Sequence, residues 1–450
     1  MSDGTIGVVV LAAGQSTRMK SAVPKVLHPI AGRPMIHHLL ATVAELGPER
    51  VVVVIGRDGG DVTAAIAPTP TVVQEPPQGT AHAVLAARDA FRGFAGDLLV
   101  LFGGDPLTGA DTMRRLVAAR RADGAAVAVL GMGVAAANMY GRLVIGRDGT
   151  LERIVEFRDA SAEERTIELC NAGVMALDAA VAFDLLAGIG NANAKREYYL
   201  TDIVALARAA GRTCVTLVGD RPEELHGIDT RADLAKVEAI VQGELRHRAM
   251  LAGATLVDPG SVFLSWDTRL APDVVVEPNV VFGPGVSVGT GARVRAFSHL
   301  DGAEIGPGAV VGPFARLRRG ARIGAGAHVG NFVEVKNASL GQGAKANHLA
   351  YLGDAEVGAG ANIGAGTITA NYDGFAKHHT TVGAGAAIGS NTVLVAPVSI
   401  GAGAIVGAGS VITRDVPPDA VALTRAPQDE RPGAARRFRA ARGAKTKDTA

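Results

Sequence analysis

Two basic residues, Arg318 and Lys336, have the spacing that most directly suggests chemistry in this chain of 450 residues. Each follows an apolar residue of a six-residue repeat, at a position that neighbouring repeats fill with glycine. Three such repeats would make one triangular coil, so residues 18 apart would stack on one edge, about 4.8 Å from each other. Two cations held so close repel each other, and an anion beside them would relieve the repulsion. The alternative is a pair of long side chains that splay into water.

Further polar residues approach the same edge of this predicted coil. After one five-residue step the repeat returns to its count, which brings His348 and Tyr351 towards the two cations. After Thr369 the repeat stops for residues 370–379, a polar insertion that would leave the coil as a loop. Cations bind phosphate, amides and phenols bind hydroxyl groups, and a histidine takes a proton at neutral pH. The residues predicted to share this pocket are Arg318, Lys336, His348, Tyr351, Asn371 and Lys377.

A second candidate site lies near the N-terminus, where a buried strand is predicted over residues 6–12. The loop after it contains Gly14 and Arg18, and Lys25 follows. Glycine lets the backbone approach a ligand, free N–H groups bind phosphate oxygens, and the two cations would neutralise a polyphosphate. The loop matches neither the dinucleotide-binding glycine pattern nor the P-loop pattern, so both are disfavoured. A simple strand-to-helix turn with solvated basic residues is the alternative.

Apolar residues at every sixth position predict the scaffold of the C-terminal half. This period fits neither a helix nor a simple alternating strand, but it is typical of short strands joined by tight turns. Small Gly and Ala residues between the apolar positions would let the chain bend. The sequence therefore predicts a parallel β-helix whose inward residues include Ile305, Val311, Leu317, Ile323, Val329 and Val335, and later Val382, Ile388, Leu394, Ile400, Val406 and Ile412.

The two halves of the chain differ in pattern, which predicts more than one domain. The first half alternates β-rich runs with helix-like segments, whereas glycine-rich repeats fill the second. Apolar residues at three-to-four-residue spacing predict a helix from Arg231 to Leu251 between them. The expected divisions are an α/β domain over residues 1–228, a linker helix over 229–250, a β-helix over 251–427 and a flexible basic tail over 428–450.

Charge and cysteine content narrow the class of protein. A net charge of +1 argues against a general nucleic-acid-binding protein and favours small-molecule substrates. Two cysteines, Cys170 and Cys214, exclude a disulfide scaffold and suit a reducing compartment. No basic signal segment precedes the first strand, and the longest apolar runs are too short to cross a bilayer. We expect a cytoplasmic protein that binds neither nucleic acid nor membrane.

The N-terminal motifs resemble a known enzyme family. Leu11-Ala-Ala-Gly, Arg18-Met and Pro24-Lys are similar to the signature of sugar-nucleotidyltransferases. With Gln78-Gly-Thr-Ala-His, Tyr140-Gly-Arg, Asn171-Ala-Gly and Glu197-Tyr-Tyr-Leu-Thr, they resemble in order and spacing the uridylyltransferase half of the bacterial bifunctional enzymes that make UDP-N-acetylglucosamine. The resemblance implies an α/β Rossmann-like domain that uses UTP. The residues that it implies for UTP and UDP-sugar binding are Leu11, Ala13, Gly14, Arg18, Lys25, Gln74, Gly79, Thr80, Gly141, Glu156, Asn171 and Thr201.

The metal site of that family is altered in this chain. The family has Gly-Asp-x-Pro-Leu, whose aspartate binds Mg²⁺, whereas this chain has Gly103-Gly104-Asp105-Pro106-Leu107. The second family ligand is an asparagine, and Asp229 stands in its place. Adjacent strand positions point to opposite faces, so the shift matters unless the loop bends. We expect Asp105 and Asp229 to form the Mg²⁺ site, and solvated loop acids are the alternative.

The C-terminal motifs resemble the acetyltransferase half of the same enzymes, through Gly330-Asn-Phe-Val-Glu-Val-Lys, His348-Leu-Ala-Tyr-Leu-Gly-Asp and Asn362-Ile-Gly-Ala-Gly-Thr. The resemblance implies a left-handed parallel β-helix of hexapeptide repeats and a homotrimer. It implies that His348 is the catalytic base for acetyl transfer from acetyl-CoA to glucosamine 1-phosphate. It also implies a sugar-phosphate site of Arg318, Lys336, Tyr351, Asn362, Asn371 and Lys377, and an acetyl-CoA site of Ala365, Ser390, Ala408 and Arg425.

The leading hypothesis is therefore one polypeptide with two activities on small-molecule substrates. It would acetylate glucosamine 1-phosphate and then join the product, N-acetylglucosamine 1-phosphate, to UTP with release of pyrophosphate. One alternative is an acetyltransferase alone, with a degraded N-terminal metal site. Another is a nucleotidyltransferase whose β-helix is only structural, although a scaffold needs no cluster of Arg318, Lys336 and His348.

Overall fold

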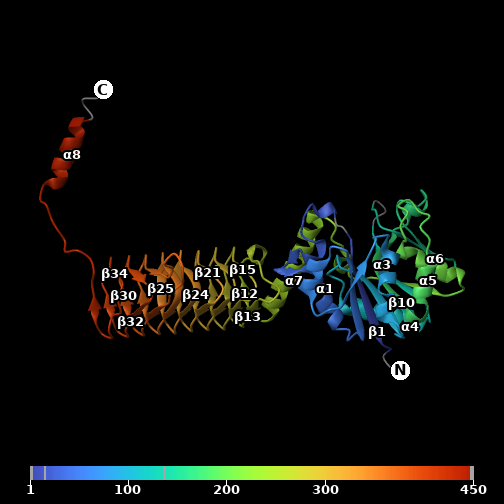
Figure 1. Ribbon diagram of the computed structural model, residues 1–450, viewed down its shortest axis with the longest axis horizontal. Coiled ribbons are helices and arrows are strands. Elements are labelled where there is room, and N and C mark those ends of the chain that lie inside the picture. The colour runs from blue at the N-terminus through green and yellow to red at the C-terminus, as the bar shows by residue number, and fades with distance from the viewer. Residues whose placement is uncertain (1–3, 15–16, 135–137, 446–450) are drawn as a thin grey trace. The chain divides into compact units, whose positions relative to one another are not determined.

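The computed structural model describes residues 4–14, 17–134 and 138–445 (Figure 1). Residues 15 and 16 of the predicted phosphate loop and residues 446–450 of the predicted tail lie outside the described residues. The chain divides into two compact units between Leu245 and Arg246, a boundary that falls inside helix α7 (Arg231–Leu251). This helix covers the stretch for which the apolar spacing predicts one.

A mixed β-sheet forms the centre of the first unit. Its strand order is β11 (Cys214–Val218), β7 (Val127–Gly133), β10 (Leu169–Asp178), β6 (Asp97–Phe102), β1 (Ile6–Ala12), β4 (Arg50–Gly56) and β5 (Thr71–Gln74). β10 is antiparallel to β6 and β7, whereas the other pairs on this path are parallel. The hairpin of β8 (Arg142–Ile145) and β9 (Leu151–Val155) pairs with β10, and β2 (Pro29–Ile30) pairs with β3 (Arg33–Pro34).

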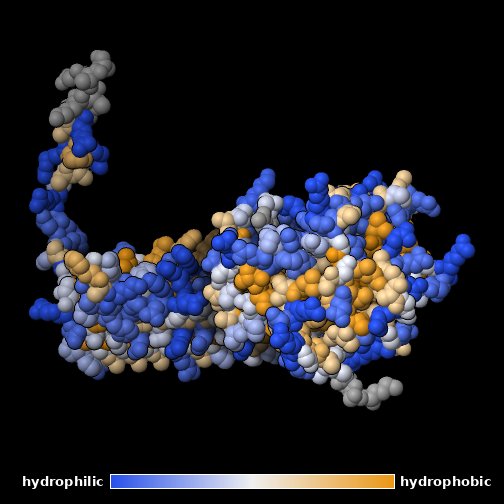
Figure 2. Space-filling view, turned by 45° about the vertical axis from the view of Figure 1, so that its right-hand side comes forward, coloured by the Kyte–Doolittle hydropathy of each residue, from blue (hydrophilic) through white to orange (hydrophobic). Residues whose placement is uncertain are grey.

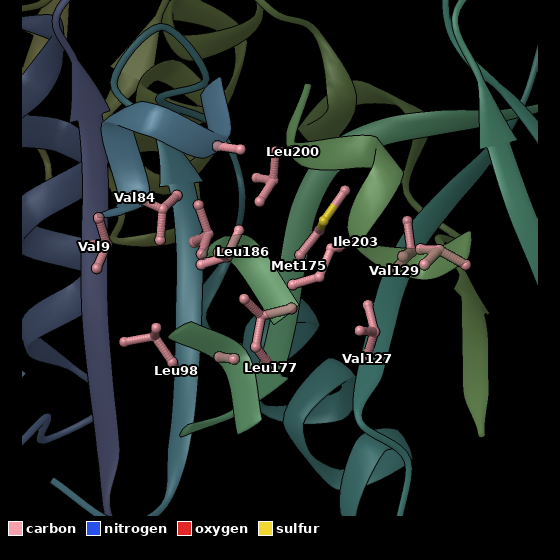
Figure 3. Packing of buried hydrophobic residues seen from close by; sticks show 14 of the residues in the cluster. Val9, Val84, Leu98, Val127, Val129, Met175, Leu177, Leu186, Leu200 and Ile203 are labelled. Carbon is pink, nitrogen blue, oxygen red and sulfur yellow. The ribbon is translucent and has the colours of Figure 1, made fainter. Parts of the chain in front are cut away.

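Helices pack on both faces of this sheet because its strands are apolar on both sides. One core combines alternate residues of β1 with α3 (Thr80–Ala86), α5 (Ala179–Ala187) and α6 (Ile203–Ala209), as Figure 3 shows for part of the cluster. The opposite core contains α1 (Met35–Ala44), α2 (Gly60–Ile66), α4 (Ala110–Ala122) and the first part of α7. This doubly covered sheet is the predicted Rossmann-like arrangement.

The second unit is a parallel β-helix with three faces, drawn as a stack of coils in Figure 1. The first face contains β12 (Thr255–Leu256), β14 (Val275–Val276), β17 (Arg293–Val294), β20 (Val310–Val311), β23 (His328–Asn331), β25 (Lys345–His348), β27 (Asn362–Ile363), β30 (Ala387–Ile388), β33 (Ile405–Val406) and β35 (Val421–Ala422). The second face contains β13 (Arg269–Leu270), β16 (Ser287–Val288), β19 (Ala303–Ile305), β22 (Ala321–Ile323), β29 (Thr380–Val382) and β32 (Val398–Ile400).

The third face contains β15 (Val281–Phe282), β18 (His299–Leu300), β21 (Arg316–Leu317), β28 (Ile368–Ala370), β31 (Val393–Val395) and β34 (Val411–Ile412). Two longer strands, β24 (Glu334–Leu340) and β26 (Tyr351–Val357), run through the corner between the third and second faces and pair on both. The two strands therefore connect the third and second faces at the level of the coils that carry Lys336 and Tyr351.

The register of the coils agrees closely with the predicted count. Leu317 pairs with Val335, and Val335 pairs with Leu352, so these three apolar residues lie in one column inside the prism. Some coils contain 17 residues rather than 18, as in the pairing of Arg293 with Val310. The five-residue steps in the repeat cause this difference, because each one removes a residue from one corner.

The basic C-terminal segment contains one helix, α8 (Ala434–Lys445). The surface view shows both hydrophilic and hydrophobic residues on it (Figure 2), and it carries four exposed arginines, Arg436, Arg437, Arg439 and Arg442. Among the described residues, no helix is long and apolar enough to cross a membrane.

A buried ion pair at the start of β6 offers a test of the first unit. The carboxylate of Asp97 is almost fully buried between Arg120 and Arg121 of α4, and its Oδ2 accepts a hydrogen bond of 2.6 Å from Nε of Arg121. We expect Asp97→Ala to lower the free energy of unfolding of the first unit by about 3 kcal/mol, because two arginines lose a buried partner. Calorimetry of the full chain would measure the shift.

The matched control is Asp89→Ala, whose pair with Arg92 is exposed on both sides and contributes little. Trp266, the only tryptophan, belongs to the second unit, so its fluorescence follows that unit separately. Equal calorimetric shifts for the two variants would contradict the role given to Asp97.

Candidate functional sites

A cavity of about 460 Å³ opens where the parallel strands of the first unit end. Its walls come from the loop after β1, the turn around Lys25, the end of β5, the start of α3 and the end of β6. Loops at the carboxyl ends of parallel strands are the usual ligand site of such sheets. The cavity is lined by eight of the predicted UTP-binding residues, namely Leu11, Ala13, Gly14, Arg18, Lys25, Gln74, Gly79 and Thr80.

Hydrogen bonds hold the part of the cavity wall that α3 contributes. The buried amide of Gln74 donates to the carbonyl of Gly79 at 2.9 Å and lies 3.2 Å from Nδ1 of His82. Gly79 has a φ of 113°, and a Cβ there would lie 2.5 Å from the carbonyl oxygen of Tyr198. The conformation and this close contact both require glycine. The start of α3 is thereby fixed against the segment that contains Tyr198.

Two cations face one carboxylate at the mouth of the cavity. Asp229 Oδ1 lies 3.0 Å from a guanidinium nitrogen of Arg18 and 3.3 Å from Nζ of Lys25. The start of α7 positions Asp229, because the next residue, Thr230, exchanges hydrogen bonds with Asp233 as a helix cap. The exposed positions of Arg18 and Asp229 leave both accessible to an incoming phosphate.

The shifted aspartate, Asp105, occupies a different environment from position 104. Burial raises the pKa of Asp105 to about 7, against the lowering effect of Lys25, and the nearby charge of Asp229 raises it further. Its carboxylate faces Gly227, where a Cβ would lie 2.8 Å from Oδ1. A Cβ at Gly104 would lie 2.5 Å from Nζ of Lys25. Position 104 therefore faces the cavity cations, whereas Asp105 points towards the loop before Asp229.

The donor set of these two carboxylates fits Mg²⁺. This ion is commonly bound by one or two carboxylates together with substrate phosphates and waters, rather than by a closed protein cage. Asp105 and Asp229 interact electrostatically beside the cation-lined cavity, and cations already approach Asp229. Within the part of the chain that the structure describes, no group of three or more His, Cys, Asp or Glu side chains is arranged to hold a metal ion.

The four predicted sugar-binding residues form a second cluster outside the lining of this cavity. Thr201 Oγ1 donates a hydrogen bond to Glu156 Oε1 at 3.2 Å, and the N–H of Asn171 donates to the carbonyl of Gly141 at 2.8 Å. Gly141 lies close to Glu156, because a Cβ at Gly141 would be only 3.5 Å from Glu156 Oε1. The Thr201–Glu156 pair and the Asn171–Gly141 pair are therefore neighbours. Burial raises the pKa of Glu156, although the hydrogen bond from Thr201 opposes this effect.

One hydrogen bond connects this cluster to the nucleotide cavity. Thr80, at the start of α3, accepts a hydrogen bond of 2.9 Å from the N–H of Leu200, the residue before Thr201. The lining also contains Phe102 and Glu197, which sequence reasoning did not assign. Phe102 ends an apolar strand and therefore has the sequence pattern of an ordinary core residue. Glu197 lies in the Glu197-Tyr-Tyr-Leu-Thr motif, and this motif is the signal that could have identified it.

In the β-helix, the predicted phosphate-binding cations gather at the corner between the third and second faces. The ammonium group of Lys377 contacts that of Lys336 and lowers the pKa of Lys336, and Arg318 adds to this effect. Arg318 donates a hydrogen bond of 2.9 Å to Glu334. Lys377 comes from the loop at residues 370–379, which leaves the coil as the sequence predicts. Three positive charges so close together favour an anionic ligand.

Tyr351 and Asn371 lie beside these cations. A Cβ at Gly353 would lie 2.4 Å from the hydroxyl of Tyr351 and 2.8 Å from Nδ2 of Asn371, so glycine leaves room for both groups. Asn371 also donates a hydrogen bond to Asp354. Burial alone would raise the pKa of Asp354, but hydrogen bonds from Asn337 and Asn371 hold it below its ordinary value.

His348 lies on the other edge of the third face, at the corner with the first face. Its Nδ1 is 2.8 Å from Oδ1 of Asn331, its neighbour in the preceding coil. When Nδ1 donates this hydrogen bond, Nε2 is the basic nitrogen. The predicted pocket is therefore arranged across one narrow face, with His348 at one edge, the cations at the other and Tyr351 between them.

The predicted acetyl-CoA residues continue the column of His348. The N–H of Gly366 donates to the carbonyl of His348 at 3.3 Å, which places Ala365 one coil further along. The N–H of Asn391 donates to the carbonyl of Ala365, and that of Gly409 donates to the carbonyl of Ser390. At the far end, Arg425 donates a hydrogen bond of 2.6 Å to the carbonyl of Ala408. The column thus contains His348, Ala365, Ser390, Ala408 and Arg425.

Comparison with known protein families agrees with both units. Residues 8–169 match the MobA-like NTP transferase domain, and residues 302–337 and 379–414 match the bacterial transferase hexapeptide of six repeats. The hexapeptide match supports the predicted left-handed course of the coils. Together the matches place a nucleotidyltransferase fold and a hexapeptide β-helix in one chain.

Relatives that align over nearly the whole chain contain both units in one protein. The bifunctional protein GlmU of Rhodospirillum rubrum is 60% identical over 433 residues, which cover 96% of this chain and 97% of that protein. The GlmU proteins of Paramagnetospirillum magneticum and Azorhizobium caulinodans are 55% and 56% identical, and each alignment covers at least 98% of both chains. The chain therefore belongs to the GlmU family of bifunctional enzymes, which combine uridylyltransferase and acetyltransferase activities.

Proposed function

We propose that the β-helix acetylates glucosamine 1-phosphate and that the first unit then transfers a uridylyl group from UTP to the product. The observation that carries this proposal is the presence in one chain of a cation-lined cavity and of the His348 column, which lies across one face of the β-helix from Lys336 and Lys377. We assign the uridylyltransferase to residues 1–228 together with the start of the linker helix at residues 229–250, which carries Asp229, and the acetyltransferase to residues 251–427, with a basic tail from residue 428. Free, buried Cys170 and Cys214 suit a reducing cytoplasm.

Separate assays of the purified protein test the whole proposal. Coenzyme A release should depend on glucosamine 1-phosphate, and pyrophosphate release should depend on UTP and N-acetylglucosamine 1-phosphate. Absence of pyrophosphate release would leave an acetyltransferase alone. Absence of coenzyme A release would leave a nucleotidyltransferase with a structural β-helix.

In uridylyl transfer, a phosphate oxygen of the sugar 1-phosphate attacks the α-phosphorus of UTP. A new P–O bond forms, and the bond to the pyrophosphate group breaks. The attacking phosphate is already an anion, so the reaction needs in-line positioning and charge neutralisation more than a general base. Lys25 and Arg18 supply positive charge at the cavity mouth, whereas Gln74, Gly79 and Thr80 would bind the uracil and ribose.

The sugar would occupy the cluster of Gly141, Glu156, Asn171 and Thr201. Its polar groups match an acetamido sugar, because the Glu156 carboxyl accepts hydrogen bonds from hydroxyls or an amide and Asn171 offers both donor and acceptor. The hydrogen bond from the N–H of Leu200 to Oγ1 of Thr80 holds this cluster against the cavity.

Asp105 and Asp229 would hold the Mg²⁺ ion of the first unit. When bound, the ion supplies positive charge to the triphosphate and to the developing charge on the leaving pyrophosphate. The chain's own contribution is to direct the two carboxylates from the loop after β6 and from the start of α7. Asp229 also fixes Lys25 and Arg18 in place until phosphate arrives.

Substitution of the two acids tests this metal site. We expect Asp105→Ala and Asp229→Ala each to lower the rate of Mg²⁺-dependent pyrophosphate release about 100-fold, because each removes a charge-bearing ligand. Asp220→Ala, which breaks an exposed pair with Arg115, is the matched control. Wild-type rates in both site variants would show that neither acid binds the metal.

Two substitutions that move a carboxylate from position 229 to position 104 test whether Asp229 takes over the role of a carboxylate at position 104. Asp229→Asn should reduce pyrophosphate release, and the addition of Gly104→Asp should restore part of the activity, because a side chain at 104 faces Lys25. The coupling energy of a double-mutant cycle measures this exchange. Purely additive effects would mean that the two positions act independently.

In acetyl transfer, the amine of glucosamine 1-phosphate attacks the thioester carbonyl of acetyl-CoA. A C–N bond forms, the C–S bond breaks, and coenzyme A leaves. Nε2 of His348 takes the proton of the amine, while Asn331 orients the imidazole through Nδ1. Arg318, Lys336 and Lys377 would bind the phosphate, and Tyr351, Asn362 and Asn371 the sugar.

Acetyl-CoA would lie along the column of Ala365, Ser390, Ala408 and Arg425. Small side chains at the first three positions leave the backbone accessible, and Arg425 offers a charge to the phosphates of the cofactor. The column ends at His348, so the thioester and the base meet at one corner. The sugar phosphate would cross the narrow third face from the cations to this corner.

Removal of His348 should separate the two activities. We expect His348→Ala to lower the rate of coenzyme A release by about 10²–10⁴-fold, the usual contribution of a general base, and to leave pyrophosphate release unchanged. His328→Ala is the control, because His328 is exposed on the first face, one coil before His348 and three residues before Asn331. Loss of both activities in a folded variant would show that the sites are not separable.

We also propose that the β-helix assembles as a homotrimer. An exposed ladder of apolar side chains, Phe297, Phe314, Phe332 and Leu349, follows the corner next to His348. The aromatic rings stack with centroids 5.0 and 5.3 Å apart. A continuous exposed apolar ladder of this kind is typical of a surface that another protein covers. Its proximity to His348 favours a second copy of this chain, which would help to enclose the acetyl-transfer site.

A charge placed in this ladder tests the assembly. We expect Phe314→Glu to reduce the mass measured by sedimentation velocity and to lower coenzyme A release, because a buried, unpaired carboxylate opposes association. Pyrophosphate release should remain. Phe438→Glu, in the exposed tail helix, is the control. An unchanged mass in Phe314→Glu would exclude the ladder from the subunit interface.

A further inference from the structure

Arg142 is the largest of the fully buried side chains, and its exposed fraction is 0%. It begins β8, directly after Gly141 of the sugar cluster. A buried guanidinium group requires several hydrogen-bond acceptors, because desolvation of an unsatisfied charge is very costly. The hydrogen bonds of Arg142 therefore show which segments of the chain this cation holds together.

The acceptors of Arg142 lie on the two segments that frame the sugar cluster. One terminal nitrogen donates to Oδ1 of Asn138 at 2.7 Å and to the carbonyl of Tyr140 at 2.6 Å. The same nitrogen lies 3.3 Å from the sulfur of Cys170. The other terminal nitrogen donates to the carbonyls of Asn138 and Arg165. Each of these acceptors is a neutral group.

A stacking contact adds a third segment to this arrangement. The guanidinium carbon of Arg142 lies 5.3 Å from the centroid of the Phe157 ring, and Phe157 directly follows Glu156. Arg165 stacks on the same ring at 5.0 Å. The planar group of Arg142 therefore contacts the residue after Glu156 as well as residues beside Gly141 and Asn171.

We propose that Arg142 is the positioning residue of the acetamido-sugar pocket in the uridylyltransferase unit. This inference rests on the proposed assignment of Gly141, Glu156 and Asn171 to that pocket. Arg142 lies outside the pocket itself, but it is the residue after Gly141. Its contacts Phe157 and Cys170 are the chain neighbours of Glu156 and Asn171. By fixing all three segments to one rigid, planar group, Arg142 sets the distance between the Glu156 carboxyl and the Gly141–Asn171 backbone pair.

Lysine cannot replace arginine in this role, although it keeps the charge. Its single ammonium group has no planar fork, so it cannot bind the Asn138, Tyr140 and Arg165 oxygens together or stack on Phe157 in the same way. Arg142→Lys would therefore loosen the pocket without removing any residue that contacts the sugar. The predicted nucleotide cavity is lined by other residues, such as Gln74, Gly79 and Lys25, and not by Arg142. The substitution should therefore leave the shape of this cavity unchanged.

The test compares KM values for the two substrates of pyrophosphate release in the full-length protein. We expect Arg142→Lys to raise KM for N-acetylglucosamine 1-phosphate about tenfold or more, which corresponds to the loss of one hydrogen bond to a charged group. KM for UTP should change less than about twofold. Preference for N-acetylglucosamine 1-phosphate over glucosamine 1-phosphate should fall, because the pocket would no longer fit the acetyl group closely.

Arg153→Lys is the matched control, since Arg153 lies on the adjacent strand β9 and pairs with Glu164 at the surface. Coenzyme A release by the same preparations reports the integrity of the second unit. If Arg142→Lys does not fold, Asn138→Ala keeps the buried cation and removes one acceptor, and it should shift KM for the sugar phosphate in the same direction.

Equal rises in both KM values, or no change in a folded variant, would overturn the positioning role and leave Arg142 a purely structural residue. An absence of sugar-dependent pyrophosphate release in the wild-type protein would instead refute the proposed function, so the two failures are distinguishable. A return of sugar preference in the double variant Arg142→Lys with Asn138→Asp, which supplies an ionic partner for lysine, would further support the role.

Discussion

Parallel pairing of strands determines where the functional residues of both units lie. In the first unit, β1, β4, β5 and β6 run in one direction, so the loops that follow them meet at one edge of the sheet. In the second unit, parallel stacking places residues of successive coils directly above one another. Neither arrangement needs the functional residues to be close in sequence, because the backbone hydrogen bonds of the ladder fix the neighbours.

The two units use this constraint in opposite ways. The sheet of the first unit converges on a cavity, where residues from segments far apart in the sequence line one concave space. The β-helix makes columns on a convex prism, so His348 and the predicted acetyl-CoA residues lie on one edge while Lys336 and Lys377 lie on another. A narrow face between them suits a small sugar phosphate better than a large ligand.

Charge is distributed so that ligands complete the sites. Lys336 and Lys377 repel each other, and the lowered pKa of Lys336 reports that repulsion. At the nucleotide cavity, Asp105 has a raised pKa because burial disfavours its charged form. Binding of an anion in the first case and a cation in the second would relieve these costs. Arg142 differs, since protein groups of its own unit, among them Asn138, Tyr140 and Arg165, accept hydrogen bonds from its two terminal nitrogens.

The altered metal motif shows why a one-residue shift cannot be judged from the sequence. Asp105 stands next to the expected position, yet its carboxylate faces Gly227 while position 104 faces Lys25. The extra carboxylate at Asp229 lies where both cations of the cavity meet. The carboxylate that lies between these two cations therefore comes from a segment more than a hundred residues away from Asp105 in the chain.

The sequence by itself determined the two fold classes, the six-residue register and about half of the residues that line the cavity of the first unit. These depend on local period and on motifs whose residue types carry their own chemistry, so they can be recognised before folding. Only the tertiary structure decided the direction of Asp105, the separation of His348 from the cations and the burial of Arg142. Those features depend on how loops bend and which distant backbone groups accept hydrogen bonds, and neither is encoded in any short segment.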